Sequence, residues 1–273
     1  MRKLFILGAA IVVSLAMLTT SCNNEKNNKE DNNANTGNPT ETSDTSEDAK
    51  EEATTVNDID GNVYKTVKIG TQVWMAENLR TTRYANGESI PLGTSTSTSR
   101  TTPYRYNPND NANNVPTYGY LYNWSAVMHV SSSSSNNPSG VQGICPDGWH
   151  VPSDAEWTEL TDYVSSQSEY RCGGDREKIA KALASTKGWE TDNESCVVGN
   201  NPSANNATGF SALPAGYCRG RYYGFGGNAE FWSATQDNDY YAYSRYLYYD
   251  YANVGRYDFD GKRNGFSVRC VRD

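Results

Sequence analysis

One segment constrains the fold of this 273-residue chain more than any other, because it places a cysteine and a tryptophan just ahead of a helix start. The segment is Cys145-Pro-Asp-Gly-Trp-His-Val-Pro-Ser-Asp-Ala-Glu-Trp157. The closing Gly265-Phe-Ser-Val-Arg-Cys-Val-Arg-Asp273 is predicted to be an alternating strand that carries another cysteine. Between them lies a tract dense in Tyr, Asn, Asp, Ser and Gly. A rigid frame with a tyrosine-rich surface favours a binding module over a catalyst.

The N-terminus has the pattern of an export signal. Met1–Phe5 is basic, and Ile6–Leu18 is an apolar run of signal-core length that is too short to span a membrane. Leu18-Thr-Thr-Ser-Cys22 then resembles the end of a bacterial lipoprotein signal, in which the cysteine is acylated. A plain secretion signal with an incidental cysteine is the alternative. We expect residues 1–21 to be a signal peptide, and a lipid on Cys22 to be the only membrane attachment.

Residues 22–56 are predicted to be a disordered tether, because they contain too few apolar side chains to offset the entropy of ordering. Nine acidic residues and three lysines give this segment a net charge of −6. Allowing for Arg2 and Lys3, −4 of the total −8 is left for residues 57–273. A mildly acidic domain argues against nucleic acid as a partner, since nucleic-acid binding requires a basic face.

Residues 57–273 have the length of one domain, and their patterns predict an α+β fold. Val63–Ile69 alternates as a strand does, and Gln72–Ala76 follows across a Gly-Thr turn as its hairpin partner. Ser153-Asp-Ala-Glu156 is a capping box ahead of a helix with an apolar face. A second helix is expected from about Asp175 to Ala184, with Gly188 as its stop signal.

Six blocks of the sequence resemble the Fibrobacter succinogenes major paralogous domain, and they occur in that family's order. The blocks are Asp58–Leu79, Tyr118-Gly-Tyr-Leu-Tyr-Asn-Trp124, Gly143–Trp157, Gly209-Phe-Ser-Ala-Leu-Pro-Ala-Gly216, Phe231-Trp-Ser-Ala-Thr235 and Gly265–Asp273. The resemblance covers residues 57–273. It implies a protein of bacterial surfaces, exported and lipid-anchored on the outer membrane, and it implies no established activity.

A more distant similarity suggests the architecture. Val151–Trp157 and Gly265–Arg269 resemble the helix-opening motif and the final strand of formylglycine-generating-enzyme-like domains. Those domains have a C-type-lectin-like fold, with two helices, a short twisted antiparallel sheet and long loops. The resemblance implies that this chain has the same plan, with its first and last strands brought together.

The family blocks also suggest how the cysteines pair. Cys145 and Cys270 both lie in such blocks, and their disulfide would join the loop before the helix to the last strand. Cys172 and Cys196 bracket the second predicted helix and form the second expected pair. Cys218 is left over, and it is either free or displaces one member of that second pair.

Tyrosines concentrate near the C-terminal end, where 11 of the chain's 20 lie between Tyr217 and Tyr257. Neighbouring strand residues face opposite ways, so a sheet cannot bury all of them. Exposed tyrosines among Ser, Asn, Gly and Arg are typical of antibody-like binding surfaces, whereas cross-strand aromatic packing is the plainer interpretation. Residues 217–257 also resemble the variable region of C-type-lectin-like proteins diversified by retroelements. The predicted ligand-binding residues are Tyr222, Tyr223, Asn228, Glu230, Asp237, Asn238, Asp239, Tyr240, Tyr241, Tyr243, Tyr248 and Tyr249.

We therefore expect a surface-anchored module that binds a glycan or protein ligand, with a structural or assembly component of the cell envelope as the alternative. An enzyme of the formylglycine-generating type is less favoured, because the cysteines occur in structural contexts. Neither Gly-x-Ser-x-Gly nor His-Glu-x-x-His occurs in the sequence. No metal or cofactor is expected, since Cys-x-x-Cys is absent and His129 and His150 are isolated.

Overall fold

The structure, a computed structural model, describes residues 54–273. The expected signal peptide, Cys22 and the tether up to residue 53 lie outside these residues. The first strand, β1 (Thr55–Asn57), includes the last two residues assigned to the tether, so the folded part begins slightly earlier than position 57. Within the described part, no helix has both the length and the apolar character needed to cross a bilayer.

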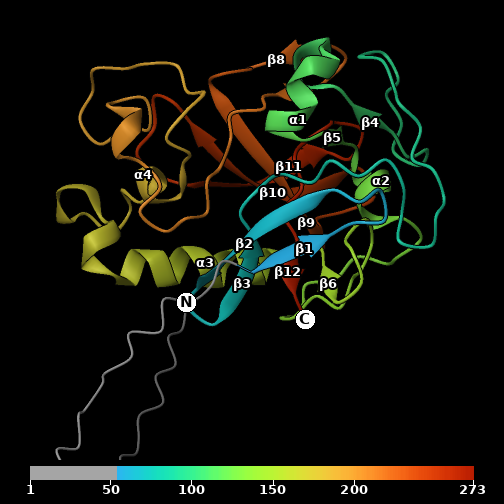
Figure 1. The fold of residues 1–273 in the computed structure, drawn as a ribbon, viewed down its shortest axis with the longest axis horizontal. Helices are drawn as coiled ribbons and strands as arrows, with labels where there is room; N and C mark the ends of the chain where they lie inside the picture. Colours follow the sequence, from blue (N-terminus) through green and yellow to red (C-terminus); the bar gives the residue numbers. More distant parts are fainter. Residues whose placement is uncertain (1–53) are drawn as a thin grey trace, which may run out of the picture. The chain divides into compact units, whose positions relative to one another are not determined.

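A five-stranded sheet in the order β1-β2-β3-β12-β6 forms one side of the domain (Figure 1). Besides β1 it contains β2 (Val63–Ile69), β3 (Gln72–Met75), β6 (Trp149–His150) and β12 (Val271–Arg272). The predicted hairpin is confirmed: β2 pairs antiparallel with β3, and Gly70 provides the positive φ that the turn requires. Because β12 pairs with β3, the first and last strands meet in one sheet.

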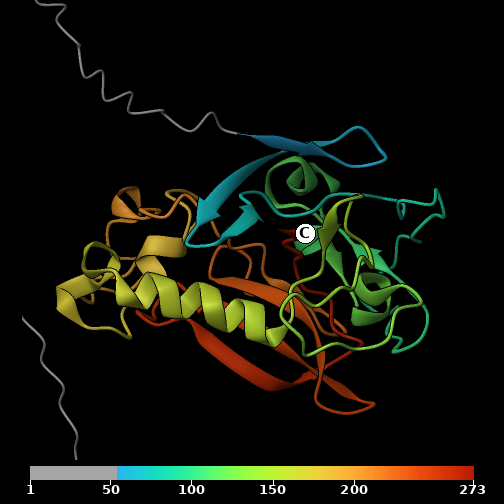
Figure 2. The same cartoon turned by 90° about the horizontal axis from the view of Figure 1, so that it is seen from below.

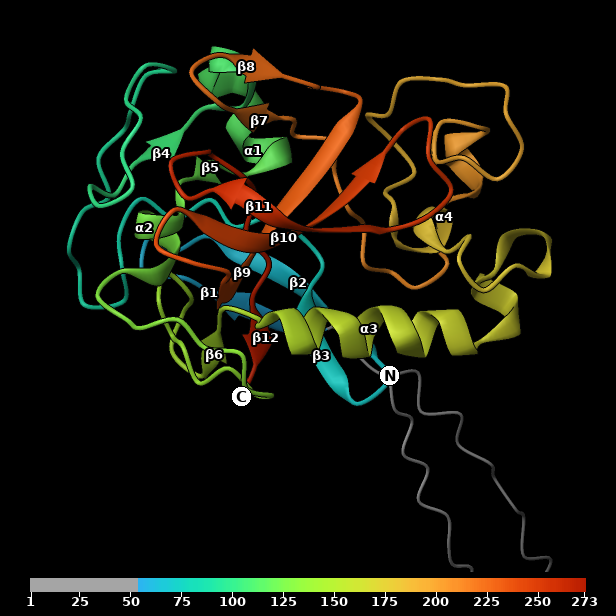
Figure 3. The same ribbon diagram turned by 180° about the vertical axis from the view of Figure 1, so that it is seen from behind.

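A second, antiparallel sheet has the order β11-β10-β9. Its strands are β9 (Asn228–Gln236), β10 (Tyr241–Tyr248) and β11 (Gly255–Gly261). The pairing of β10 with both neighbours shifts between Ala242 and Ser244, where the strands are irregular. The smaller hairpins β4–β5 and β7–β8 complete the strand set (Figure 3). Their bounds are β4 (Arg105–Tyr106), β5 (Leu121–Tyr122), β7 (Tyr217–Cys218) and β8 (Tyr222–Tyr223).

The helix α3 (Asp154–Ser166) lies between the two sheets (Figure 2). Ser153 and Glu156 form both hydrogen bonds of the predicted capping box. The Trp157 ring contacts each sheet, with ring centroids 4.7 Å from Trp74 on β3 and 5.5 Å from Phe231 on β9. The helix therefore joins the two sheets through one aromatic core, and the α+β class is confirmed.

The prediction of a second helix from Asp175 to Ala184 is wrong in length. Only one turn, α4 (Ala180–Leu183), is α-helical. Gly173 and Gly174 both adopt positive φ, and the Cys172 amide donates to the carbonyl of Lys178, so the chain turns here instead of coiling. The other short helices are α1 (Val115–Tyr118), α2 (Trp124–Met128), η1 (Pro108–Asp110), η2 (Ala112–Asn114), η3 (Ser168–Tyr170), η4 (Cys172–Gly174) and η5 (Pro202–Ala204).

The closing segment runs through the middle of the domain. Every residue from 265 to 271 is buried, so the predicted alternation of exposed and buried positions is wrong. Phe266 bridges to Tyr122 and Ser267 bridges to Phe231 on β9, before Val271 enters the five-stranded sheet. The segment is covered on both sides because it connects the two sheets.

Arg269, in this closing segment, is fully buried. Its guanidinium donates to Oδ1 of Asn78 at 2.7 Å and to the carbonyls of Met75, Phe210 and Ser211 at 2.9, 2.6 and 2.7 Å. Burial lowers the pKa of Arg269 to about 9. The four hydrogen bonds tie the closing segment to β3 and to the Phe210 loop.

Both expected disulfides are present. Cys145 pairs with Cys270, 125 residues away, and Cys172 pairs with Cys196, 24 residues away. Cys218 is a free, buried cysteine on β7 and packs in a small cluster with Tyr106 and Leu121. The open question of the fifth cysteine is thus answered: it displaces no member of either pair.

Candidate functional site

The two faces of the β9–β11 sheet have different chemistry. Phe231 and Arg245 face α3, where they contact Trp157 and Asp154. Glu230 and Tyr246, which lie opposite one another in register, belong to the other face. Strand alternation therefore separates a packed face from a polar, tyrosine-rich face.

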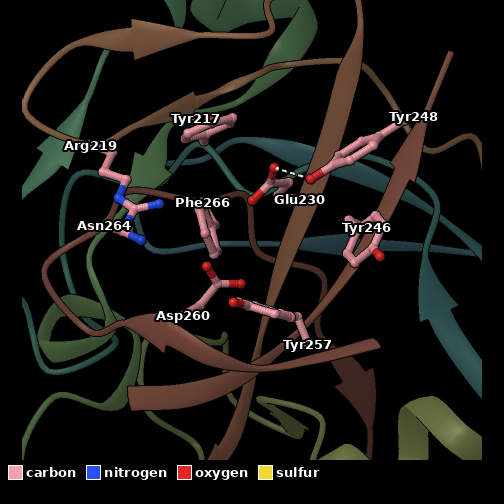
Figure 4. A pocket seen from close by; sticks show the side chains of 9 residues that line it. All are labelled: Tyr217, Arg219, Glu230, Tyr246, Tyr248, Tyr257, Asp260, Asn264 and Phe266. Atoms are coloured by element: carbon pink, nitrogen blue, oxygen red, sulfur yellow. Dashed lines mark hydrogen bonds between the residues drawn. The ribbon is translucent and has the colours of Figure 1, made fainter. Parts of the chain in front are cut away.

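A pocket of about 260 Å³ opens on the tyrosine-rich face (Figure 4). Glu230 and Asp260 both point into it, from β9 and β11. The complete lining is Tyr217, Arg219, Glu230, Tyr246, Tyr248, Tyr257, Asp260, Asn264 and Phe266. Five aromatic rings, two carboxylates, one amide and one guanidinium thus surround a cavity of monosaccharide size.

Glu230 is the most deeply buried acidic group of this pocket, with 6% of its surface exposed. Its Oε1 accepts from the Tyr248 hydroxyl at 3.3 Å and from the Asn228 amide at 3.4 Å, which are both long hydrogen bonds. Burial, followed by repulsion from Asp260, raises the pKa of Glu230 to about 8. This carboxyl group is therefore mostly protonated at pH 7 and becomes half ionised near pH 8.

Asp260 is the second carboxylate of the pocket. Its Oδ2 accepts from the Ser244 hydroxyl at 2.5 Å. Burial raises the pKa of Asp260 to about 6, against the opposing effects of this hydrogen bond and of Arg219. At pH 7 the pocket consequently has at least one negative charge on its floor.

A second pocket, of about 320 Å³, adjoins the first and has the opposite charge. The two share Arg219 and Asn264. The other lining residues of the second pocket are Arg100, Tyr240, Tyr241, Phe259, Gly261 and Arg263. The Arg100 guanidinium lies over the Tyr240 ring, 4.0 Å from its centroid. We call these two adjoining pockets, one acidic and one basic, the tyrosine groove.

The structure brings four of the twelve predicted ligand-binding residues into this groove. Glu230 and Tyr248 line the acidic pocket, and Tyr240 and Tyr241 line the basic one. Asn228 contributes through its hydrogen bond to Glu230. The tyrosine tract thus forms part of two pockets, but only some of the predicted ligand-binding residues line them.

The remaining predicted residues lie elsewhere. Tyr243 lies beneath the Arg256 guanidinium, and Tyr249 packs against the α3 core. Tyr222 packs near Cys218, and Tyr223 stacks on Tyr217. Asp237, Asn238 and Asp239 are exposed in the turn between β9 and β10. None of these seven side chains lines the groove.

Seven lining residues of the acidic pocket were not predicted: Tyr217, Arg219, Tyr246, Tyr257, Asp260, Asn264 and Phe266. Tyr246 lies opposite Glu230 in the paired strands, and Tyr248 lies two residues further along β10, so both side chains are on the same face of the sheet as Glu230. Correct strand bounds would therefore have placed these three residues together. Arg219 comes from a turn whose placement no local pattern predicts.

A buried ionic cluster elsewhere has a structural explanation. His150 lies between Oε1 of Glu156 and Oδ1 of Asp273, at 2.5 Å from each. Burial opposes protonation of His150, but the hydrogen bonds to the two carboxylates raise its pKa. Glu156 is also the capping-box residue of α3, so the cluster holds β6, α3 and the chain end together. Within residues 54–273, no group of three His, Cys, Asp or Glu side chains is arranged to hold a metal.

Glu230 makes a testable contribution to stability. A carboxyl group whose pKa rises from 4.5 to about 8 on folding keeps its proton in the native state at pH values where the unfolded chain releases it. Stability is therefore lost as pH rises through this interval. We expect Glu230→Gln to reduce this loss and to raise the free energy of unfolding at pH 8 by about 2 kcal/mol. Urea unfolding at pH 5 and pH 8 measures it.

The matched control for this prediction is Glu169→Gln, which changes an exposed carboxylate in η3, just after α3. It should leave the difference in stability between pH 5 and pH 8 as it is in the parent protein. An equal difference in the Glu230→Gln protein and the parent would contradict the assignment of a raised pKa to Glu230.

Comparison with known proteins supports the resemblance read from the sequence. The family model described as the Fibrobacter succinogenes major domain matches residues 67–272. The comparisons with curated proteins and with solved structures each give no match. The family match extends from the second strand of the five-stranded sheet to the last, so it includes both pockets of the tyrosine groove. Since it covers well over half of the sequence, this chain belongs to the Fibrobacter succinogenes major domain family.

Proposed function

We propose that this protein is a non-catalytic, lipid-anchored surface protein that binds a glycan or protein ligand in the tyrosine groove. The observation that carries the proposal is the groove itself, with two adjoining pockets on the side of the β9–β11 sheet that faces away from α3. Its composition suits recognition, because rigid tyrosines supply contact area while carboxylates, an amide and guanidinium groups supply hydrogen bonds. The sequence pattern at Cys22 supports the anchor.

A C-type-lectin-like arrangement is part of the proposal. Antiparallel sheets, one long helix and a first and last strand that share a sheet support it. The groove then occupies the loop-rich tyrosine tract, which is also where a diversified variable region would lie. Tyr223, Tyr240 and Tyr241 are exposed and would be suitable positions for such variation.

The test is binding of the purified full chain to glycan and protein arrays. The informative variant changes the three exposed groove tyrosines, Tyr240, Tyr241 and Tyr257, to Ser, because their exposed fractions of 57%, 38% and 48% allow replacement with little loss of stability. We expect the parent protein to bind specific ligands and the triple variant to lose at least about tenfold in affinity, or 1.4 kcal/mol.

Tyr163→Ser is the matched control, since Tyr163 is 37% exposed but lies on α3, away from the groove. It should bind as the parent does. Equal loss in the control and in the triple variant would mean that the groove is not the binding surface. A folded parent protein that binds nothing on either array would favour the envelope-assembly alternative.

A further inference from the structure

We propose that the acidic pocket, which rests on the binding role proposed for the groove, receives the primary ammonium group of an amino sugar. The pocket supplies acceptors, negative charge and aromatic walls, and the adjoining pocket supplies positive charge. Each of these features is carried by named side chains of residues 54–273.

The acceptors are the first feature. Two carboxylate oxygens of residues that line the pocket receive no hydrogen bond within residues 54–273: Oε2 of Glu230 and Oδ1 of Asp260. A primary ammonium group has three N–H donors and no acceptor. Its donors match an excess of acceptors, which a trimethylammonium group could not satisfy.

The charge is the second feature. Within the described part of the chain, neither Glu230 nor Asp260 forms a salt bridge, although Glu230 is buried. Arg219 is exposed at the border of the pocket and lowers the pKa of both carboxyl groups, but it lies beyond salt-bridge distance of either one. A buried carboxylate without a cationic partner is costly, and the raised pKa of Glu230 reflects that cost. A bound ammonium would supply the missing positive charge.

The walls are the third feature, and they favour a sugar over a lysine side chain. Tyr217, Tyr246, Tyr248, Tyr257 and Phe266 surround the carboxylates (Figure 4). Aromatic faces attract cations, and they also pack against the C–H faces of a sugar ring. A volume of about 260 Å³ accommodates a whole ring, and the tyrosine hydroxyls and Arg219 remain available for sugar hydroxyl groups. A lysine tip would leave those groups unpaired.

The basic pocket gives the groove direction. Arg100, Arg219 and Arg263 make that end unfavourable for a cation. An ammonium group is therefore confined to the acidic end, and the next unit of a glycan chain would extend toward the arginines. This polarity predicts that hydroxyl-rich or anionic units are tolerated next to the amino sugar.

The experiment is calorimetric titration of the purified full chain at pH 7 with glucosamine, glucose and N-acetylglucosamine. These three probes differ mainly at one ring position, which carries an ammonium, a hydroxyl or a neutral amide. We expect glucosamine to bind at least about tenfold more tightly than either neutral sugar. Glu230→Gln should abolish this preference while the chain stays folded, and Glu169→Gln should retain it.

Each other outcome would overturn the proposal in a distinct way. Equal binding of glucosamine and N-acetylglucosamine would show that the pocket does not recognise the ammonium group. An unchanged preference for glucosamine in Glu230→Gln would show that the ammonium group does not bind at Glu230. Tighter binding of Nα-acetyl-lysinamide than of glucosamine would mean that the pocket binds a lysine side chain of a protein and not an amino sugar. No binding of any probe, with positive glycan or protein arrays, would reject this inference and leave the proposed function standing.

Discussion

Arg269→Met is expected to lower the free energy of unfolding by about 3–5 kcal/mol, which is a large fraction of the roughly 5–15 kcal/mol that stabilises a typical domain. The guanidinium donates four hydrogen bonds to Asn78 and to three backbone carbonyls, and it is fully buried. Methionine fills a similar volume but donates none of these bonds. Four acceptors would then lie in the core without donors, and each unsatisfied group costs about 1–3 kcal/mol before relaxation.

Urea unfolding followed by tryptophan fluorescence measures this loss, since Trp74 and Trp157 lie in the same core as the Arg269 site. Arg272→Met is the matched control, because Arg272 lies three residues further along and is exposed on β12. The control should change stability by less than about 0.5 kcal/mol. Similar stabilities for the two variants would show that the buried hydrogen bonds of Arg269 contribute nothing.

The Cys145–Cys270 disulfide is expected to contribute the second large effect. Replacing both cysteines by Ser should lower the free energy of unfolding by about 4–5 kcal/mol, because the disulfide closes a loop of 125 residues in the unfolded chain. Both sulfurs also lie in the main core, where two serine hydroxyls would need new partners. Urea unfolding of the double variant under oxidising conditions measures the change.

The second disulfide provides the comparison. Cys172 and Cys196 close a loop of only 24 residues at a less buried site, so their double Ser variant should lose about 3 kcal/mol. Cys218→Ser controls for loss of a thiol that pairs with nothing. If the two disulfide variants lost equal stability, or if the Cys172–Cys196 variant lost more, loop length would not be what determines these contributions.

Local patterns predicted local structure well. The hairpin of β2 and β3 and the capping box of α3 depend on residues within about ten positions of one another, and both are confirmed. The prediction of the second helix failed because the apolar spacing reflects burial of a single helical turn, α4. The two glycines ahead of that turn, Gly173 and Gly174, adopt positive φ and bend the backbone. Periodicity identified the buried face correctly but could not show that the chain turns before it.

The candidate site was only partly predictable, because its residues come together through strand register. The sequence identified the tyrosine tract, but it could not place Tyr248 in the groove and Tyr249 in the core without the bounds of β10. The carboxylate partner Asp260 lies on a different strand, and nothing in its local sequence links it to Glu230. Likewise, burial of Gly265–Val271 on both sides depends on two sheets that are each assembled from distant segments.

The path of residues 265–271 has a consequence for how the protein folds. Both sheets, the Arg269 hydrogen bonds and the long-range disulfide require this segment, so the chain cannot complete its core until residues 265–271 are in place. Residues 54–264 alone would leave apolar surface of both sheets exposed, which makes such an intermediate prone to aggregation. Purified chains that end before residue 265 should therefore be protease-sensitive throughout, whereas chains that include residues 265–271 should be resistant under oxidising conditions.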